Sequence, residues 1–102
     1  MSQHFEFFFE WDPIKAATNQ RKHGVSFELA TTVFNDPLMI SIPDEDHSES
    51  EERWVTIGQA RNTKLLLVVH TYLDVGTNSA TVRLISARPA TLHEQRQYEA
   101  IP

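Results

Sequence analysis

The chain has 102 residues, 40% of them apolar, a formal net charge of −5 and no cysteine. This length predicts a single folded domain over residues 1–102, because either half alone would be too small to bury a core of its own. The missing cysteines exclude disulfides, thiolate metal sites and a thiol nucleophile, and no apolar run approaches the roughly 20 residues of a membrane helix.

The N-terminal stretch MSQHFEFFFEW carries acids inside its apolar run and lacks a basic leader. It is therefore not typical of a signal peptide, and we expect a cytoplasmic protein with no membrane partner. From Phe5 to Trp11 the aromatic residues alternate with glutamates, except at Phe8. This alternation predicts a half-buried strand.

Two helices are predicted next. Asp12 supplies an N-cap immediately before a proline, and Gly24 supplies a stop, so the first helix should cover about 13–23. Ser26 can cap a second helix, whose apolar residues recur at helical spacing until Asp36-Pro37 ends it. We expect the two helices to form a hairpin.

The remainder is predicted to be strands followed by a short helix. Alternating or β-branched segments cover residues 38–42, 53–59, 64–72 and 81–87. The continuous run LLLVV is typical of a central strand that is buried on both faces. TLHE fits a capping box that begins a short C-terminal helix. The order predicts an α+β fold with an antiparallel meander of about four to five strands.

The charges are unevenly distributed along the chain. Residues 44–52 (DEDHSESEE) hold six of the fourteen acids, whereas residues 53–102 are net +3. The overall charge argues against nucleic-acid binding, which depends on Lys and Arg that neutralise phosphates. The basic C-terminal half weakens that objection, and the acidic run by itself is most simply a solvated loop.

Metal and nucleotide motifs are not found. The five histidines are scattered, with no pair three or four residues apart on one predicted helix, and the three glycines are far apart. We therefore predict no metal and no cofactor. Cationic and imidazole side chains instead stand near the ends of the predicted elements, namely Lys22, His23, Arg53, His70, Arg83 and Arg88.

These residue types suit RNA cleavage. A base takes the proton from the ribose 2′-OH, cations stabilise the charge on the phosphorane, and an acid protonates the leaving 5′-oxygen. Each residue also has a structural interpretation: Arg53 can pair with the acids upstream, His70 can be a hydrogen-bonded residue at a strand end, and Tyr98 can pack. The spacing of Arg83 and Arg88 is odd, so in a regular strand they point to opposite faces, and they can converge only if the strand bends or ends near Ala87.

The motifs KHGVSFE (22–28), ER-x-x-x-IG (52–58), VVHT (68–71) and ISAR (85–88) together resemble the BrnT family of toxins from type II toxin–antitoxin modules. The resemblance covers nearly the whole chain. It implies a RelE-like fold and a ribonuclease that works without metal and halts translation. It also implies a cognate BrnA-like antitoxin that neutralises the toxin and forms a hetero-oligomer which reaches operator DNA through the antitoxin.

Carried over residue by residue, the resemblance implies catalytic roles for Lys22, His23, Arg53, His70 and Arg88. It says less about Arg83 and Tyr98, which we predict to bind substrate. A second hypothesis is a noncatalytic module that binds an antitoxin and assists control of its operon. The acidic net charge and the lack of a single decisive catalytic motif motivate this alternative.

Overall fold

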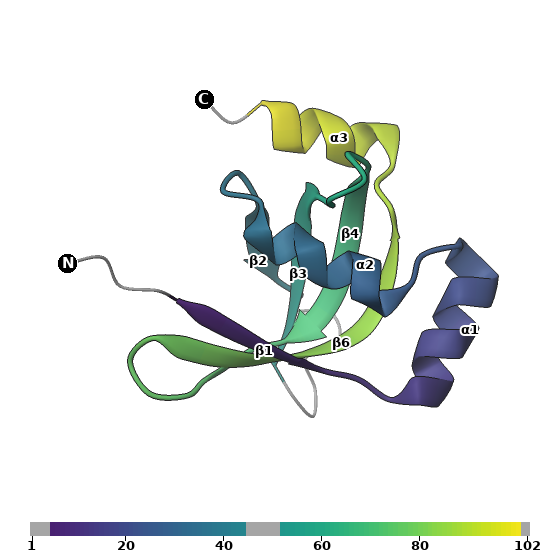
Figure 1. The fold of residues 1–102 in the computed structure, drawn as a ribbon. Helices are drawn as coiled ribbons and strands as arrows, with labels where there is room; N and C mark the ends of the chain where they lie inside the picture. Colours follow the sequence, from purple (N-terminus) through teal and green to yellow (C-terminus); the bar gives the residue numbers. More distant parts are fainter. Residues whose placement is uncertain (1–4, 45–51, 101–102) are drawn as a thin grey trace.

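The computed structural model describes residues 5–44 and 52–100. Its elements follow one another in the order β1 (Glu6–Glu10), α1 (Pro13–His23), α2 (Phe27–Thr31), the 3-10 helix η1 (Thr32–Asn35), β2 (Ile40–Pro43), β3 (Arg53–Gln59), β4 (Leu65–Thr71), β5 (Leu73–Asp74), β6 (Ser79–Pro89) and α3 (Leu92–Glu99) (Figure 1). The predicted α+β class is confirmed. In this part of the chain no helix is both long and apolar enough to cross a membrane.

The helices begin and end where local chemistry predicted. The Asp12 carboxylate accepts a hydrogen bond from the Ile14 N–H at 2.8 Å, and Gly24 ends α1 in the left-handed conformation with φ of 70°. Ser26 Oγ accepts from the Leu29 N–H at 3.0 Å at the start of α2. The capping box of Thr91 and Glu94 is complete at the start of α3. These boundaries follow from hydrogen bonds between residues two to four positions apart, so the residue types that form them can be recognised in the sequence.

The sheet is larger than predicted and is not wholly antiparallel. Its strand order is β1-β6-β4-β3-β2, with the short β5 also paired to β6. Strands β2, β3, β4 and β6 form the expected antiparallel arrangement, but β1 lies parallel to β6. The prediction of four to five antiparallel strands is therefore wrong at this edge. A parallel pair needs a long crossover, and strand periodicity alone does not identify which distant strand becomes the partner.

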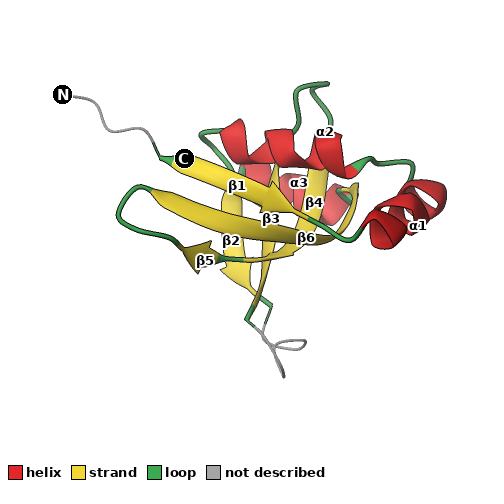
Figure 2. Ribbon diagram, turned by 60° about the horizontal axis from the view of Figure 1, so that its bottom comes forward, coloured by secondary structure: helices red, strands yellow, loops and turns green. Residues whose placement is uncertain are grey.

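The two N-terminal helices do not form the expected hairpin. Figure 2 shows α2 crossing one face of the sheet, while α1 lies at its side, beyond the end of β1. Helix α1 packs against β6, and α2 packs against β6 and η1. The helices part because each packs against the sheet. Local capping and periodicity signals predict where a helix begins and ends but not what it packs against.

Asn19 of α1 takes the place of a missing strand beside β6. Its side chain is only 5% exposed. The Nδ2 group donates to the Ala87 carbonyl at 2.8 Å and to the Val25 carbonyl at 3.0 Å, while Oδ1 accepts from the Ala87 N–H at 3.0 Å. One amide thus satisfies both backbone groups of Ala87 where β1 no longer pairs with β6.

The main core lies on the face of the sheet that α2 and η1 cover, which we call the inner face. Phe27, Ala30, Val33 and Phe34 of these helices pack on apolar strand residues such as Leu66, Val68, Val82, Leu84 and Ala87. Helix η1 approaches β3 so closely that a Cβ at Gly58 would lie 2.7 Å from Val33 Cγ1. The glycine of the ER-x-x-x-IG motif is therefore explained by packing.

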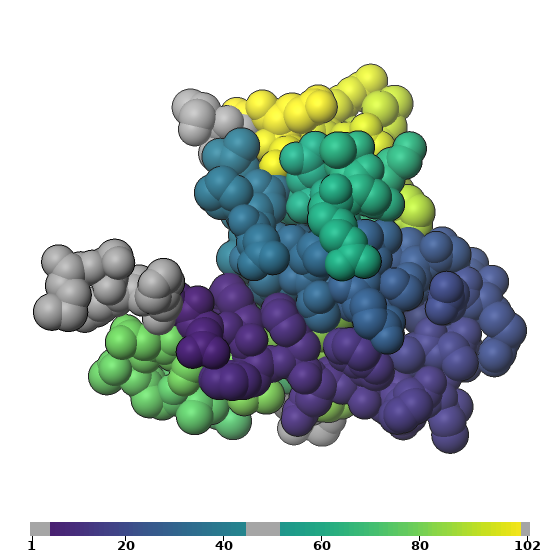
Figure 3. Space-filling model, in the orientation of Figure 1, coloured from purple at the N-terminus to yellow at the C-terminus, as the bar shows by residue number. Residues whose placement is uncertain are grey.

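Helix α3 is anchored at both ends by polar contacts. Arg88 and Glu94 form two parallel hydrogen bonds of 2.8 Å, and Glu94 also accepts from the Thr91 N–H. The Tyr98 hydroxyl donates to Asp36 Oδ2 at 2.6 Å. In Figure 3 the yellow surface of α3 accordingly adjoins the segment that follows η1. These contacts fix α3 relative to the sheet.

Hydrogen bonding shifts the pKa values of the groups that hold the two ends of α3. The bond from Arg88, supported by the Thr91 contacts, outweighs burial and lowers the pKa of Glu94 to about 2. The Asp36 contact raises the pKa of Tyr98 to about 12. Burial alone would raise the pKa of Asp36, but hydrogen bonds from Gln59, Tyr98 and Leu38 together lower it.

We predict that Asn19→Ala destabilises the fold by about 2–4 kcal/mol, because it leaves the buried N–H and C=O of Ala87 without partners. Urea unfolding followed by circular dichroism measures this change. Gln20→Ala, at an exposed position of the same helix, is the matched control and should lie within about 0.5 kcal/mol of the wild type. Equal stability of the two variants would contradict the role assigned to Asn19.

We predict that acid weakens the wild type partly through Glu94. A carboxyl whose folded pKa is depressed stabilises the fold above its unfolded pKa, and this contribution disappears as pH falls from about 4.5 towards 2. Glu94→Gln should therefore cost about 1–2 kcal/mol at pH 7, a figure reduced for solvent screening because Arg88 is 35% exposed.

The difference should close near pH 2, as measured by urea unfolding across pH. Glu99→Gln, on the exposed surface of α3, is the control and should follow the wild-type curve. A gap that persists unchanged at pH 2 would show that the Glu94 effect is not electrostatic.

Candidate functional site

A β-bulge in β6 decides which arginines share a face of the sheet. Val69 pairs with Ser86, but the next residue, His70, pairs with Leu84, so Ile85 is an extra residue in β6. Leu84 and Ala87 are both buried although they are three residues apart, which shows that the alternation is reset. Arg83 and Arg88 would point to opposite faces in a regular strand, but the bulge makes β6 irregular between them, so both lie on the face opposite α2.

Arg53 lies on this second face as well, which we call the outer face. Arg53 of β3 is the cross-strand partner of Thr71 in β4. On the other side of β4, the backbone N–H of Arg83 in β6 donates to the Thr71 Oγ1 at 3.3 Å. The three residues form a row across neighbouring strands in the order Arg53, Thr71, Arg83. Both arginines are half-buried.

A groove of about 590 Å³ lies on the outer face between this sheet and α3. Its apolar floor consists of Ile42, Val55, Ile57, Leu67 and Val69, and its polar lining includes Asp44, Arg88, Glu94 and Gln97. Arg88 is the cross-strand partner of Leu67. The groove therefore combines an apolar floor with the Arg88 guanidinium at one end. The row of Arg53, Thr71 and Arg83 lies on the same face outside the groove lining, farther along β4.

The ion pair with Glu94 presets the orientation of Arg88. The guanidinium also donates to the Pro89 carbonyl at 3.2 Å. Hydrogen bonding to Glu94 raises the pKa of Arg88, and Glu94, with its pKa of about 2, is ionised near neutral pH and is a weak base. The arrangement suits a fixed cation better than a proton-transfer pair.

The structure places His70 on the inner face, away from the arginines. It is 2% exposed, and its ring meets Phe34 edge-on with centroids 5.0 Å apart. Nδ1 lies 2.8 Å from the Thr71 carbonyl and Nε2 lies 2.6 Å from Thr56 Oγ1. A carbonyl only accepts, so Nδ1 carries the proton and Nε2 accepts from the Thr56 hydroxyl. Burial lowers the pKa of His70, which favours this neutral form.

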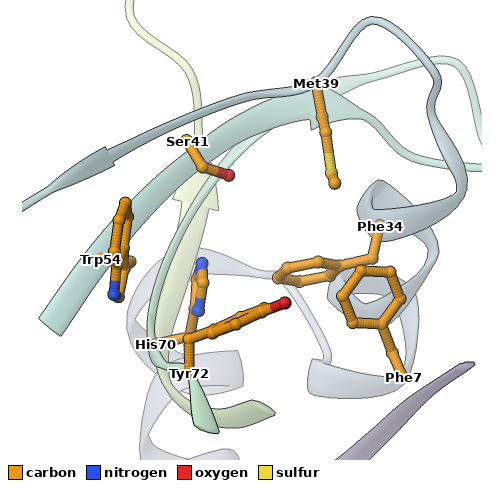
Figure 4. Close-up of a pocket in the computed structure, with 7 residues that line it drawn as sticks. All are labelled: Phe7, Phe34, Met39, Ser41, Trp54, His70 and Tyr72. Atoms are coloured by element: carbon orange, nitrogen blue, oxygen red, sulfur yellow. The ribbon is translucent and has the colours of Figure 1, made fainter. Parts of the chain in front are cut away.

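Beside His70 is a second pocket, of about 260 Å³, on the inner face. Figure 4 shows its lining of Phe7, Phe34, Met39, Ser41, Trp54, His70 and Tyr72. The Ser41 hydroxyl lies 2.6 Å from Thr56 Oγ1, so a hydrogen-bonded chain runs from Ser41 through Thr56 to His70. The walls are otherwise mainly apolar and aromatic, and this pocket contains none of the predicted arginines.

The remaining predicted residues lie apart from the arginine row. Lys22 and His23 of α1 line a depression of about 240 Å³ with Ile85 and Ser86, at the flank of β6. Lys22 is exposed and His23 is half-buried. Tyr98 points to Asp36, at the far end of α3 from Glu94. The structure thus puts Arg53, Arg83 and Arg88 on one face of the sheet and Lys22 and His23 at the flank of β6. His70 and Tyr98 lie elsewhere.

Sequence reasoning did not select Thr71, Asp44 or Glu94, which lie on the outer face or line its groove. The sequence did place Glu94 close to Arg88, because α3 begins soon after the strand that carries this arginine. The capping box, however, already explained why a glutamate stands at position 94. Thr71 and Asp44 gave no local signal. Among the described residues, no three His, Asp or Glu side chains are grouped so as to hold a metal ion.

Comparisons with known proteins agree with this architecture. Residues 11–94 match the family model described as "Ribonuclease toxin, BrnT, of type II toxin-antitoxin system". A search of curated proteins gave no match. The crystal structure of the Brucella abortus ribonuclease toxin BrnT superposes with a TM-score of 0.57 at 22% identity, covering 85% of this chain and 97% of that one. That likeness shows a shared fold, and the family match covers most of the sequence, so the chain belongs to the BrnT family of ribonuclease toxins of type II toxin–antitoxin systems.

Proposed function

We propose that the outer-face groove is the active site of an endoribonuclease that cleaves RNA without a metal ion and thereby inhibits translation. The observation that carries the proposal is that Arg53, Arg83 and Arg88 lie on one face of the sheet, which Arg83 and Arg88 share because of the bulge in β6. Guanidinium groups are permanently charged and match phosphate oxygens in geometry. Membership of a ribonuclease toxin family supports the same reading.

In the proposed reaction, the ribose 2′-oxygen attacks the adjacent phosphorus and loses its proton to a base. The bond to the 5′-oxygen breaks, leaving a 2′,3′-cyclic phosphate, and that oxygen takes up a proton. Arg53 and Arg83 would stabilise the negative charge that develops on the phosphorane oxygens. Their fixed positions in strands supply this stabilisation without a large rearrangement. Arg88, about 13 Å away along β4, would hold a neighbouring phosphate of the same strand.

The proton acceptor is expected among the carboxylates of the groove. Asp44 and Glu94 both line it, but Glu94 is held by Arg88 and its low pKa makes it a weak base. We therefore assign proton transfer to Asp44, and Glu94 positions Arg88. Lys22 and His23 lie at the flank of β6, where they can contact the RNA backbone beyond the groove.

We also propose that the protein is cytoplasmic and acts with a BrnA-like antitoxin, in a hetero-oligomer that reaches operator DNA through the antitoxin. Support comes from the family description, which places these toxins in type II toxin–antitoxin systems. The RelE-like fold that we propose rests on the motifs that resemble the BrnT family.

A noncatalytic antitoxin-binding module remains the second candidate. The specific observation in its favour is that two nitrogens of Arg88 are already engaged by Glu94 at 2.8 Å, together with the net charge of −5. In that case the arginines would contact an acidic partner instead of RNA. Retention of partner binding without any RNA cleavage would favour this alternative.

One prediction of the proposed function concerns the arginines. In EDTA, purified protein freed of antitoxin should cleave labelled total RNA. Arg53→Ala or Arg88→Ala should each reduce the rate by about 10²-fold or more, because Arg53 faces the charged transition state and Arg88 positions the strand beside it. Arg61→Ala, at an exposed position outside the groove, is the matched control and should cleave normally. Folded Arg53→Ala protein that still causes full growth arrest in cells would argue against the site.

The second prediction separates the two groove carboxylates. Asp44→Asn should lower kcat by about 10²- to 10⁴-fold, as expected for loss of a positioned base. Glu94→Gln should have a smaller effect on kcat, because Glu94 only positions Arg88. If Asp44→Asn keeps the wild-type rate, the base must be another group.

A further inference from the structure

We infer that Thr71 binds a phosphate of the RNA through its hydroxyl, and that His70 positions Thr71 from the opposite face of the sheet. The assignment rests on the proposed function and deepens it, since it concerns the same outer-face site. His70 lies on the inner face, so its ring cannot reach the groove. In this assignment it acts as a positioning residue for Thr71.

The position of Thr71 suits an anion. Its hydroxyl lies on the outer face between two cations, Arg53 on one neighbouring strand and Arg83 on the other. In the described part of the chain, the Thr71 hydroxyl has one hydrogen-bond partner, the Arg83 N–H, towards which it acts as acceptor. Its own proton is therefore directed away from that N–H and can be donated to a phosphate oxygen.

Residues on the inner face fix the backbone of Thr71. The His70 Nδ1–H donates to the Thr71 carbonyl at 2.8 Å, and Thr56 holds the other ring nitrogen at 2.6 Å. Phe34 packs edge-on against the ring. Since the bulge in β6 lies opposite Val69 and His70, the regular pairing of β4 with β6 is interrupted next to Thr71. The imidazole supplies a fixed contact where the ladder is irregular.

This geometry also indicates the extent of the substrate. Arg88 lies beside Leu67 and Arg83 beside Thr71, four residues farther along β4, or about 13 Å in an extended strand. A single nucleotide would occupy one end only. The site is therefore suited to a single strand of several nucleotides, with one phosphate at Arg88 and another at the row of Arg53, Thr71 and Arg83.

The test measures binding separately from cleavage. A mixed-sequence, single-stranded 2′-O-methyl RNA cannot be cleaved through its 2′-oxygen, and its affinity is read by fluorescence anisotropy at low salt. Thr71→Val, which keeps the β-branched shape, should weaken binding by about tenfold or more, as for loss of one hydrogen bond to a charged group. Thr71→Ser should restore it. Thr81→Val, also half-buried on β6, is the matched control and should bind like the wild type.

Variants of His70 test the positioning role. His70→Phe keeps the contact with Phe34 but removes the Nδ1–H, so it should lose as much affinity as Thr71→Val, and the double variant should lose no more than either single one. His70→Asn places an amide N–H near the Nδ1 position and should retain binding. Its pH–rate profile on cleavable RNA should keep the wild-type shape, whereas loss of a catalytic imidazole would remove a limb.

The outcomes separate this assignment from the proposed function. A wild type that neither binds nor cleaves RNA would overturn the proposed function. A wild type that binds while Thr71→Val binds equally well would overturn the Thr71 assignment alone. If His70→Phe does not fold, the Thr71→Val and Thr71→Ser pair still decides the phosphate contact, and a limb lost from the His70→Asn profile would overturn the positioning role.

Discussion

The single extra residue in β6, Ile85, is the constraint on which the site depends. Without it, strict alternation would send Arg83 and Arg88 to opposite faces, and one of them would have to enter the core. With it, Leu84 and Ala87 both fill the inner core while both arginines lie on the outer face. The bulge therefore lets one strand serve a continuous hydrophobic core and a cationic surface.

The neighbourhood of the bulge is held by side chains acting as substitutes for backbone partners. Asn19 pairs with both backbone groups of Ala87 where β1 has ended. In the neighbouring strand β4, His70 donates to the carbonyl of Thr71, the residue that follows it. Both side chains are almost fully buried, so their polar groups are costly to leave without partners. An irregular strand is thus stabilised from two directions, which keeps the arginines in defined places.

The charge distribution is compatible with the proposed RNA site in a chain that is acidic overall. The acids concentrate in residues 44–52, whereas the outer face carries three arginines, one of them oriented by Glu94. Local potential near a groove depends on the charges that line it more than on the total. In the proposed reaction Glu94 is a poor candidate for the base, because the contact that orients Arg88 lowers the basicity of this carboxylate.

The sequence by itself determined the α+β class, the helix caps, most strand positions and the family, because these depend on residues close together in the chain or on a recognisable motif. It also selected Arg53 and Arg88 as cationic candidates. Only the tertiary structure decided that β1 pairs in parallel with β6, that α1 and α2 part, and that Arg83 joins the other arginines while His70 faces away. Partner choice and bulges arise from packing between distant segments, and a one-residue shift in register reverses the face of every side chain beyond it.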